Sequence, residues 1–238
     1  TRMDVMVFIS ALQRHSHQPK VLHCKKLNRL LSWIQRHPKR LSFKRFGGGG
    51  QQTEATETHL RVVSDAAFKK EEEDGYSLRG VVYFRAAGSQ FHSTALTVAH
   101  VLDWTCKSQR HVCRSTFAAE LLGAGDAVDQ GILIAQMIYE VTHGAISAAY
   151  AKRLRDAGGY APIALYIDAK SVFAAVAATF IKTPAEKSLL SHVQFIRELL
   201  DNKVLHAILW IDTRDMYADG LAKGAVGREA LHEAMDCI

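Results

Sequence analysis

Apolar side chains recur at helical spacing in the first 36 residues. Two segments, 4–16 and 20–36, are predicted to be helices, and in the second one Leu27, Leu30 and Ile34 fall on one face. Lysine and arginine fill many of the polar positions between the apolar ones. The pattern therefore predicts a basic pair of amphipathic helices at this end of the chain.

Beyond residue 58 the pattern changes to short apolar runs that are typical of strands. The runs 60–63, 80–84 and 96–104 are separated by loops, which favours an antiparallel meander. The run 163–167 is apolar at every position, as in a strand that is covered on both faces, and 205–211 predicts a fifth strand. A single sheet of five strands is expected.

Helical patterns fill the remaining part of this region. The expected helices are 115–141, a second one that ends near residue 156, one that begins at Ser171, 184–200 and a short last one over 216–223. Thr183 as N-cap and Glu186 three residues later are suited to the start of the 184–200 helix. The element order predicts an α/β fold whose mixed five-stranded sheet, with three antiparallel and then two parallel strands, is flanked by helices.

Charge is distributed unevenly and indicates the domain organisation. Residues 1–46 hold eleven of the thirty Lys and Arg but only Asp4 among the acids, so this arm carries +10 while the remainder carries −4. The polar stretch 47–58 begins with four glycines and predicts a linker before a body at 59–224 and a tail at 225–238. The arm is expected to contact nucleic-acid phosphates. The alternatives are a solvated surface, or an arm that packs on the body as part of one compact domain.

The composition of the 238 residues, 48% hydrophobic and 23% charged, is that of a globular protein. No apolar run reaches the ~20 residues of a membrane span, and no secretory signal is evident, so no membrane association is expected. The four cysteines form no CxxC pair, which argues against structural zinc and favours reduced thiols in a cytoplasmic or nuclear setting. Because the sequence begins with Thr1, we expect a piece of a longer chain. The oligomeric state is left open.

Four acidic residues stand at positions that suit chemistry. Asp65 and Asp168 each come at the end of a predicted strand, the edge where ligand-binding groups of α/β sheets gather. Glu120 lies in the first turns of a predicted helix, and Asp219 lies in the last one. Converging carboxylates repel each other unless a metal ion neutralises them, and such oxygen ligands suit Mg²⁺ or Mn²⁺. Each acid alone is more often a turn, cap or surface residue, so the prediction depends on all four together.

Other polar and aromatic residues lie near these acids in the sequence. The cations expected to meet phosphates are Lys107, Arg110, Arg114 and Lys170. Lysine and arginine are about as often ordinary surface residues, so both interpretations stay open. Trp104 and Trp210 are expected to be core aromatics rather than platforms on which bases stack.

Several segments, in the same order and with similar spacing, resemble the ribonuclease H domain in the polyprotein of copia-type long-terminal-repeat retrotransposons. They are 63–68 (the family's YSDADW block), 104–121 (W.SKKQ..V..STAEAEY), 165–168 with Ser171, 195–198 (FIRE, residue for residue) and 210–223 (YV.T..Q.AD.LTK). The arm resembles the segment that links reverse transcriptase to this domain. The likeness thus extends over residues 1–224, and the polymerase's own Asp-Asp motif is absent.

The resemblance implies a ribonuclease H-like fold and a metal-dependent endonuclease that cuts the RNA strand of RNA–DNA hybrids during reverse transcription. Two Mg²⁺ ions, replaceable by Mn²⁺, would act on the four carboxylates. Asp65 and Asp168 would be the core ligands, Asp219 would complete the second metal site, and Glu120 would also lie beside the scissile 2′-hydroxyl. The reverse transcriptase part of the same polyprotein would be the partner.

The resemblance also adds candidate substrate contacts, namely the motif serines Ser64, Ser115 and Ser171. One departure from the family is Ala169, where an Asn commonly follows the strand-four Asp, so a contact to the substrate strand is lost. Two alternatives to a hybrid ribonuclease stay open. One is a catalytically silent module that binds nucleic acid or connects domains, and the other is a different nuclease of the same superfamily, such as a transposase or resolvase.

Overall fold

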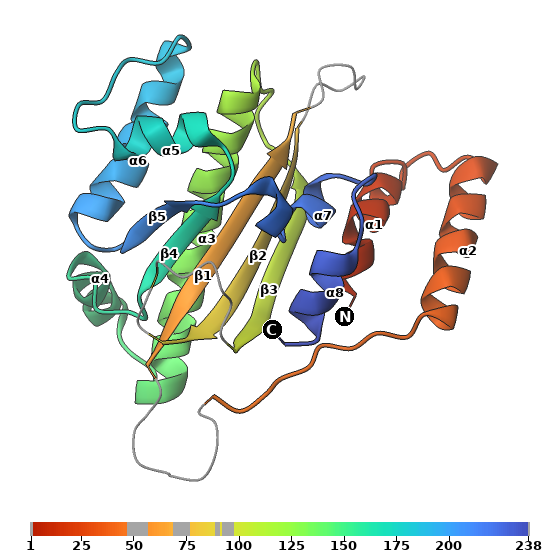
Figure 1. Cartoon of the computed structure of the whole chain (residues 1–238), viewed down its shortest axis with the longest axis horizontal. Coiled ribbons are helices and arrows are strands. Elements are labelled where there is room, and N and C mark those ends of the chain that lie inside the picture. Colours follow the sequence, from red (N-terminus) through yellow and green to blue (C-terminus); the bar gives the residue numbers. More distant parts are fainter. Residues whose placement is uncertain (1, 47–56, 69–76, 89–90, 92–97, 238) are drawn as a thin grey trace.

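The computed structural model describes residues 2–46, 57–68, 77–88, 91 and 98–237. Its centre is a five-stranded sheet in the order β3-β2-β1-β4-β5 (Figure 1). The strands are β1 (Thr58–Ala67), β2 (Leu78–Ala87), β3 (Ala99–Ser108), β4 (Ile163–Ile167) and β5 (Ala207–Trp210). The pairs β1–β2 and β2–β3 are antiparallel, whereas β1–β4 and β4–β5 are parallel. The predicted mixed sheet of the ribonuclease H type is confirmed.

Helices cover both faces of this sheet (Figure 1). One face packs against α3 (Thr116–His143), α5 (Lys170–Ala177) and α6 (Leu190–Asp201), and the other against α1 (Met6–Gln13), α7 (Asp219–Ala222) and α8 (Glu229–Met235). The remaining helical segments are α2 (Val21–Arg36), α4 (Ala148–Asp156) and the short 3₁₀ helices η1 (Met3–Val5), η2 (Lys187–Leu189) and η3 (Thr213–Asp215). The two faces therefore bury two separate apolar clusters.

Strand β1 lies in the middle of the sheet and is longer than predicted. It was expected to end at Asp65, but its pairing with β2 continues to Ala67, and Asp65 stands opposite Gly80 in the register. Side chains alternate along a strand, so Val62 faces the α3 cluster while Val63 and Asp65 face the opposite side. The longer strand carries Asp65 inside the sheet rather than at its end.

Several helical segments differ from the sequence prediction. The helix expected over 4–16 consists of η1 and α1, and the one expected over 216–223 is limited to α7. The helix expected from 184 begins at Leu190, after the 3₁₀ turn η2. Glu186 accepts a hydrogen bond from the Ser188 hydroxyl at 3.2 Å, so it does not serve the helix start that Thr183 was expected to cap. The region expected to be a tail contains α8, whose Leu231 and Met235 are at most 1% exposed. Burial against the sheet, which no local pattern reveals, makes this segment a helix.

The N-terminal arm divides into a buried part and an exposed part. Met3 and Val7 belong to the apolar cluster on the α8 side of the sheet, and Asp4 is fully buried and bonded to Arg2 and His232. Helix α2 has no buried residue. Most of the predicted linker, 47–56, lies outside the described residues.

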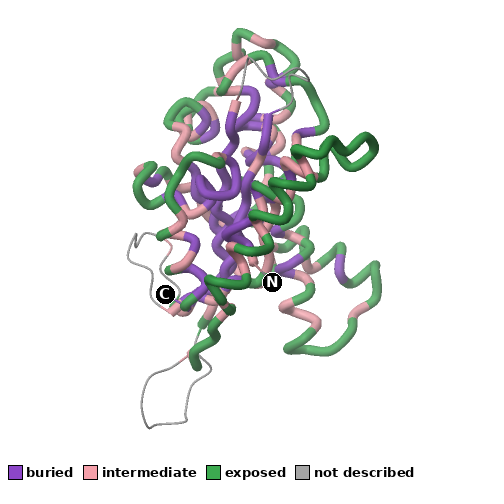
Figure 2. Tube along the Cα trace, turned by 90° about the vertical axis from the view of Figure 1, so that its right-hand side faces the viewer, coloured by how far each residue is buried: buried purple, intermediate pink, exposed green. Residues whose placement is uncertain are grey.

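Burial is concentrated in the sheet and in the helix faces that contact it (Figure 2). Helix α3, the longest, has buried residues along its sheet-facing side, from Ala118 to Ala135. In the part of the chain that the structure describes, no single helix has the length and hydropathy to cross a membrane. Helices α3 and α4 pass such a test only as a pair, across a bend of 115°.

Gly80 is predicted to be required for the close packing of α7 against β2. A Cβ atom at this position would lie 2.6 Å from the Ala218 carbonyl oxygen and 2.8 Å from Leu221 Cβ. Gly80→Ala should lower the free energy of unfolding by about 1–3 kcal/mol through overpacking, as measured by urea denaturation. The matched control is Gly125→Ala in α3, where an added Cβ meets nothing within 4 Å. Equal stability of the two variants would contradict this role.

Candidate active site

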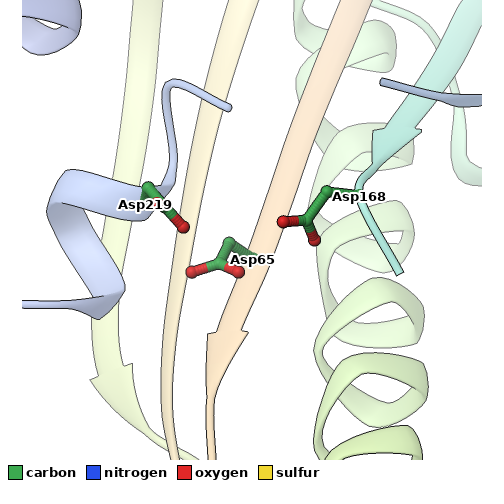
Figure 3. Close-up of side chains that lie close together, drawn as sticks. All are labelled: Asp65, Asp168 and Asp219. Carbon is green, nitrogen blue, oxygen red and sulfur yellow. The ribbon is translucent and has the colours of Figure 1, made fainter. Parts of the chain in front are cut away.

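Three of the four predicted acids converge in the structure. Asp65, Asp168 and Asp219 each offer a carboxylate oxygen, and these oxygens all lie within 4.8 Å of one another. Figure 3 shows the three side chains pointing toward a common point from β1, from the end of β4 and from α7. The convergence expected from strand ends and the last helix is thus observed for these three residues.

The sheet register explains why Asp65 and Asp168 meet. The parallel pairing of β1 with β4 runs from Leu60–Ile163 to Val63–Tyr166. Strand β4 ends at Ile167, so Asp168 leaves the sheet beside Asp65 on the neighbouring strand. Two carboxylates on adjacent strands are therefore placed together by backbone pairing alone.

Asp219 reaches the same point because α7 lies close to the sheet. The helix packs over Gly80, the β2 residue that stands opposite Asp65. Without a side chain at Gly80, the backbone of Ala218 and Ala222 can approach β2. Asp219 is the first residue of α7, so the close approach carries its carboxylate to Asp65.

Asp65 is the most strained carboxylate of the cluster in electrostatic terms. It is fully buried, and its Oδ2 atom has no hydrogen-bond partner among the described residues. Burial raises the pKa of Asp65 to about 7; Lys223 lowers it, whereas the charges of Asp219 and Asp168 raise it further. An orphaned carboxylate oxygen beside two further carboxylates is a donor set that fits a divalent cation such as Mg²⁺ or Mn²⁺.

Glu120 lies beside this cluster, in the second turn of α3, rather than within it. Its side chain is buried, at 7% exposure. Burial raises the pKa of Glu120 to about 9, and the charges of Asp65 and Asp168 add to the effect, while a hydrogen bond from the Ala66 backbone opposes it. Its nearness to both aspartates agrees with the predicted four-acid arrangement, although Glu120 does not share their 4.8 Å cluster.

Lys223 is a site residue that the sequence reasoning missed. Its Nζ atom donates to Asp65 Oδ1 at 3.2 Å and to Asp219 Oδ1 at 2.5 Å. Burial lowers the pKa of Lys223, but the two carboxylates outweigh it and raise the pKa above its ordinary value. The available signal was spacing, since Lys223 follows Asp219 by four residues. The ammonium group partly neutralises the acidic cluster.

Asp168 is held by the last residue of β5 and by a residue of the 3₁₀ helix η3. The Thr213 hydroxyl donates to Asp168 Oδ2 at 3.0 Å, and the indole N–H of Trp210 donates to the Asp168 backbone oxygen at 2.9 Å. Lys170 lies over the Trp210 ring, with its Nζ atom 4.5 Å from the centroid. The expectation of a core aromatic is wrong for Trp210, which is 38% exposed, because its polar edge is fixed at the site. Trp104 packs, partly buried, against the α8-side cluster.

The predicted substrate contacts lie in different environments. The exposed ones are Lys107, Arg110, Arg114, Lys170 and Ser171. Ser115 is the N-cap of α3 and accepts a hydrogen bond from the Ala118 N–H. Ser64 is 1% exposed and its hydroxyl has no hydrogen-bond partner among the described residues. Contact of any of these residues with a substrate stays a prediction.

Gln109 is another residue that the sequence reasoning missed. Its Nε2 atom donates to the Ala119 carbonyl oxygen at 2.6 Å, and its Oε1 atom accepts from the Cys113 thiol at 2.8 Å. The side chain is buried, at 4% exposure. Gln109 therefore ties the end of β3 to the start of α3, where Glu120 lies.

Thr213 is predicted to orient Asp168 for metal binding. Thr213→Val keeps the shape of the side chain but removes the donor to Oδ2, whereas Thr213→Ser keeps the donor. Loss of a hydrogen bond to a metal-binding carboxylate typically weakens metal affinity about 10-fold or more. Calorimetric titration with Mn²⁺ should show this loss for the Val variant and near-normal affinity for the Ser variant. Equal affinity of the two variants would rule out the orienting role.

Glu120 is predicted to make the metal-free protein less stable as the pH rises. Its pKa is raised from 4.5 to about 9 on folding, so the folded state holds a proton that the unfolded state releases. The contribution of Glu120 to the free energy of unfolding is therefore complete below about pH 4.5 and is lost as the pH rises toward 9. In urea unfolding with chelator present, the free energy of unfolding of Glu120→Gln should rise by more than about 1 kcal/mol relative to that of the parent as the pH increases over this range. A pH-independent difference would contradict the raised pKa.

Comparison with known proteins adds a weak structural likeness. Neither a protein-family model nor a curated protein matches the sequence. One similar solved structure is the N-terminal RNase H domain of Rv2228c from Mycobacterium tuberculosis, at 20% identity, covering 74% of this chain and 99% of that one, with a TM-score of 0.41. RNase H1 of Halobacterium salinarum NRC-1 has 14% identity, coverages of 75% and 97%, and a TM-score of 0.38. LC11-RNase H1, isolated from compost, has 11% identity, covers 72% of this chain and 96% of that one, and has a TM-score of 0.40. Because these TM-scores are low, the ribonuclease H-like fold follows from the strand order and directions instead.

Proposed function

We propose that the chain is a divalent-metal-dependent endonuclease that hydrolyses the RNA strand of RNA–DNA hybrids. The observation that carries the proposal is the buried Asp65 carboxylate, whose Oδ2 atom has no hydrogen-bond partner among the described residues and which lies against Asp168 and Asp219. Lys223 compensates only part of the charge of the three carboxylates, and the remainder is costly in a folded protein unless a further cation compensates it. A ribonuclease H-like sheet with this cluster on its central strand suits phosphodiester hydrolysis.

Asp65, Asp168 and Asp219 would hold the metal, with Glu120 completing the set. Two Mg²⁺ ions, or Mn²⁺ in their place, supply an activated water and stabilise the leaving oxygen when bound in such a site. The chain's own part is positioning. Backbone pairing fixes Asp65, Thr213 holds the carboxylate of Asp168, and α7 delivers Asp219.

Near the reacting phosphate, Glu120 would hold a proton and Lys223 would supply a positive charge. With a pKa of about 9, the Glu120 carboxyl holds a proton at neutral pH before metal and substrate enter. It can then meet the 2′-hydroxyl of the RNA strand, the group that distinguishes RNA from DNA. Lys223 supplies a positive charge at Asp65 and Asp219.

The hybrid would be held by cations at the margin of the site. Lys107, Arg110, Arg114 and Lys170 are exposed, and lysine and arginine are common donors to nucleic-acid phosphates. We also propose that the chain acts beside the reverse transcriptase part of the same copia-type polyprotein, in a reducing intracellular compartment. The support for this setting is the sequence resemblance and the scattered cysteines.

A second candidate function is a silent module that binds nucleic acid without cutting it. The excess of Lys and Arg in residues 1–46 and the exposure of α2 favour this alternative. Phosphate binding by such a surface needs no metal and weakens steeply with salt. The two functions therefore differ in metal dependence.

Metal-dependent loss of the RNA strand alone is the expected result when the protein meets a labelled RNA–DNA hybrid in Mg²⁺ or Mn²⁺, with chelator as the blank. Asp65→Asn should abolish cleavage but keep binding of the hybrid, because it removes a metal ligand without changing the surface. Asp201→Asn, which changes an exposed acid on α6, is the matched control and should cut normally. Undiminished cleavage by Asp65→Asn would overturn the proposal. If the parent protein binds the hybrid without cutting it, the silent module is established. Cleavage of duplex DNA would indicate another nuclease of the superfamily.

A further inference from the structure

A large groove separates the two helices of the N-terminal arm. It has a volume of about 760 Å³ and lies between α1 and α2, which stand side by side at the edge of the molecule (Figure 1). Its apolar lining includes Phe8, Leu12, Leu30 and Trp33. None of the four carboxylates of the candidate active site lines it. We call this feature the arm groove.

The two walls of the arm groove are held differently. Helix α1 is anchored to the body through buried Val7 and through the Ser10 hydroxyl, which donates to the Cys106 carbonyl oxygen at 2.6 Å. Helix α2 has no buried residue. Leu30 and Trp33 of α2 therefore line the groove while they are only partly buried.

Positive charge marks the α2 wall of the arm groove. Lys26 and Arg29 line it and are exposed, and no acidic side chain among the described residues forms an ion pair with either. The only acid in residues 2–46 is Asp4, which is buried and already bonded to Arg2 and His232. The arm cannot neutralise its own groove.

We propose that the arm groove binds an amphipathic helix of a partner protein, with an apolar stripe on Leu30 and Trp33 and acidic residues facing Lys26 and Arg29. An apolar floor with charged edges is the arrangement in which a helix docks through residues spaced i, i+3, i+4 and i+7. The α2 wall of the groove extends from His23 to Trp33, about 15 Å at 1.5 Å per residue, which matches a ligand helix of about three turns. This inference is independent of the nuclease activity.

Nucleic acid fits the arm groove less well than a helix does. A phosphate backbone would use the cations but would gain nothing from the apolar floor. Base stacking needs a free aromatic face, but Trp33 already stacks on the His37 ring at 4.6 Å and lies under the Arg2 guanidinium at 5.4 Å. The apolar floor is therefore the feature that selects a protein helix.

A labelled synthetic peptide of Leu and Glu tests the inference, with Leu at i, i+3, i+4 and i+7 and Glu at the flanking positions. Fluorescence anisotropy with the whole chain should show saturable binding, and a scrambled peptide of the same composition should not bind. The double variant Lys26→Glu/Arg29→Glu should weaken binding at least about 10-fold. The matched control, Lys25→Glu/Arg40→Glu, makes the same charge change outside the groove lining and should bind like the parent.

Circular dichroism confirms that each variant folds, and Leu30→Ser provides a second, uncharged test of the floor. Weakened binding by both groove variants with an unaffected control supports the inference. Equal binding of the scrambled peptide, or equal loss in the control variant, overturns it. Two further outcomes also overturn it: loss of RNA–DNA hybrid binding in place of peptide binding would assign the groove to nucleic acid, and a dimer that Leu30→Ser dissociates in sedimentation would assign it to a second copy of the chain.

Discussion

The structure depends on one unfavourable placement, the carboxylate of Asp65 in the interior of the sheet. The strand that carries it is the central one, bounded by β2 and β4, so solvent has no access to the side chain. A carboxylate in that environment is destabilised as a charge, which explains its raised pKa. Gly80 gives space to α7, which places Asp219 and the following Lys223 at the carboxylate. Lys223 offsets part of the cost, whereas Asp219 and Asp168 add to it.

Much of this arrangement could be predicted from the sequence. The apolar runs and their separating loops predicted five strands in a mixed sheet, and the rule that ligand-binding groups gather at strand ends pointed to Asp65 and Asp168. Element boundaries were less predictable because they depend on partners far along the chain. Strand β1 continues past Asp65 because β2 pairs with it, and α8 forms because Leu231 has a place in the core. The local pattern of apolar and polar residues predicts neither of these boundaries.

The residues that support the carboxylates were also hidden from sequence reasoning. Thr213, Trp210 and Gln109 act through hydrogen bonds that exist only after β5 lies beside β4 and β3 turns toward α3. Their residue types carry no distinctive signal, since threonine and glutamine are common on any surface. Trp210 shows the difficulty best: an aromatic in an apolar strand suggests a core position, yet its indole N–H is bonded at the site and its ring is partly exposed.

Charge is managed oppositely in the two halves of the molecule. The body collects acids that repel one another, and it tolerates them through a proton on Glu120 and the ammonium group of Lys223. The arm collects cations and has a single acid, Asp4, which is buried and paired with Arg2 of the arm, and whose contact with His232 of α8 fastens η1 to the body. Asp4 is thus committed to holding the arm in place and is unavailable to its cations. A cation would relieve the first imbalance and an acidic surface the second, so the two proposed sites would each have their charge completed from outside.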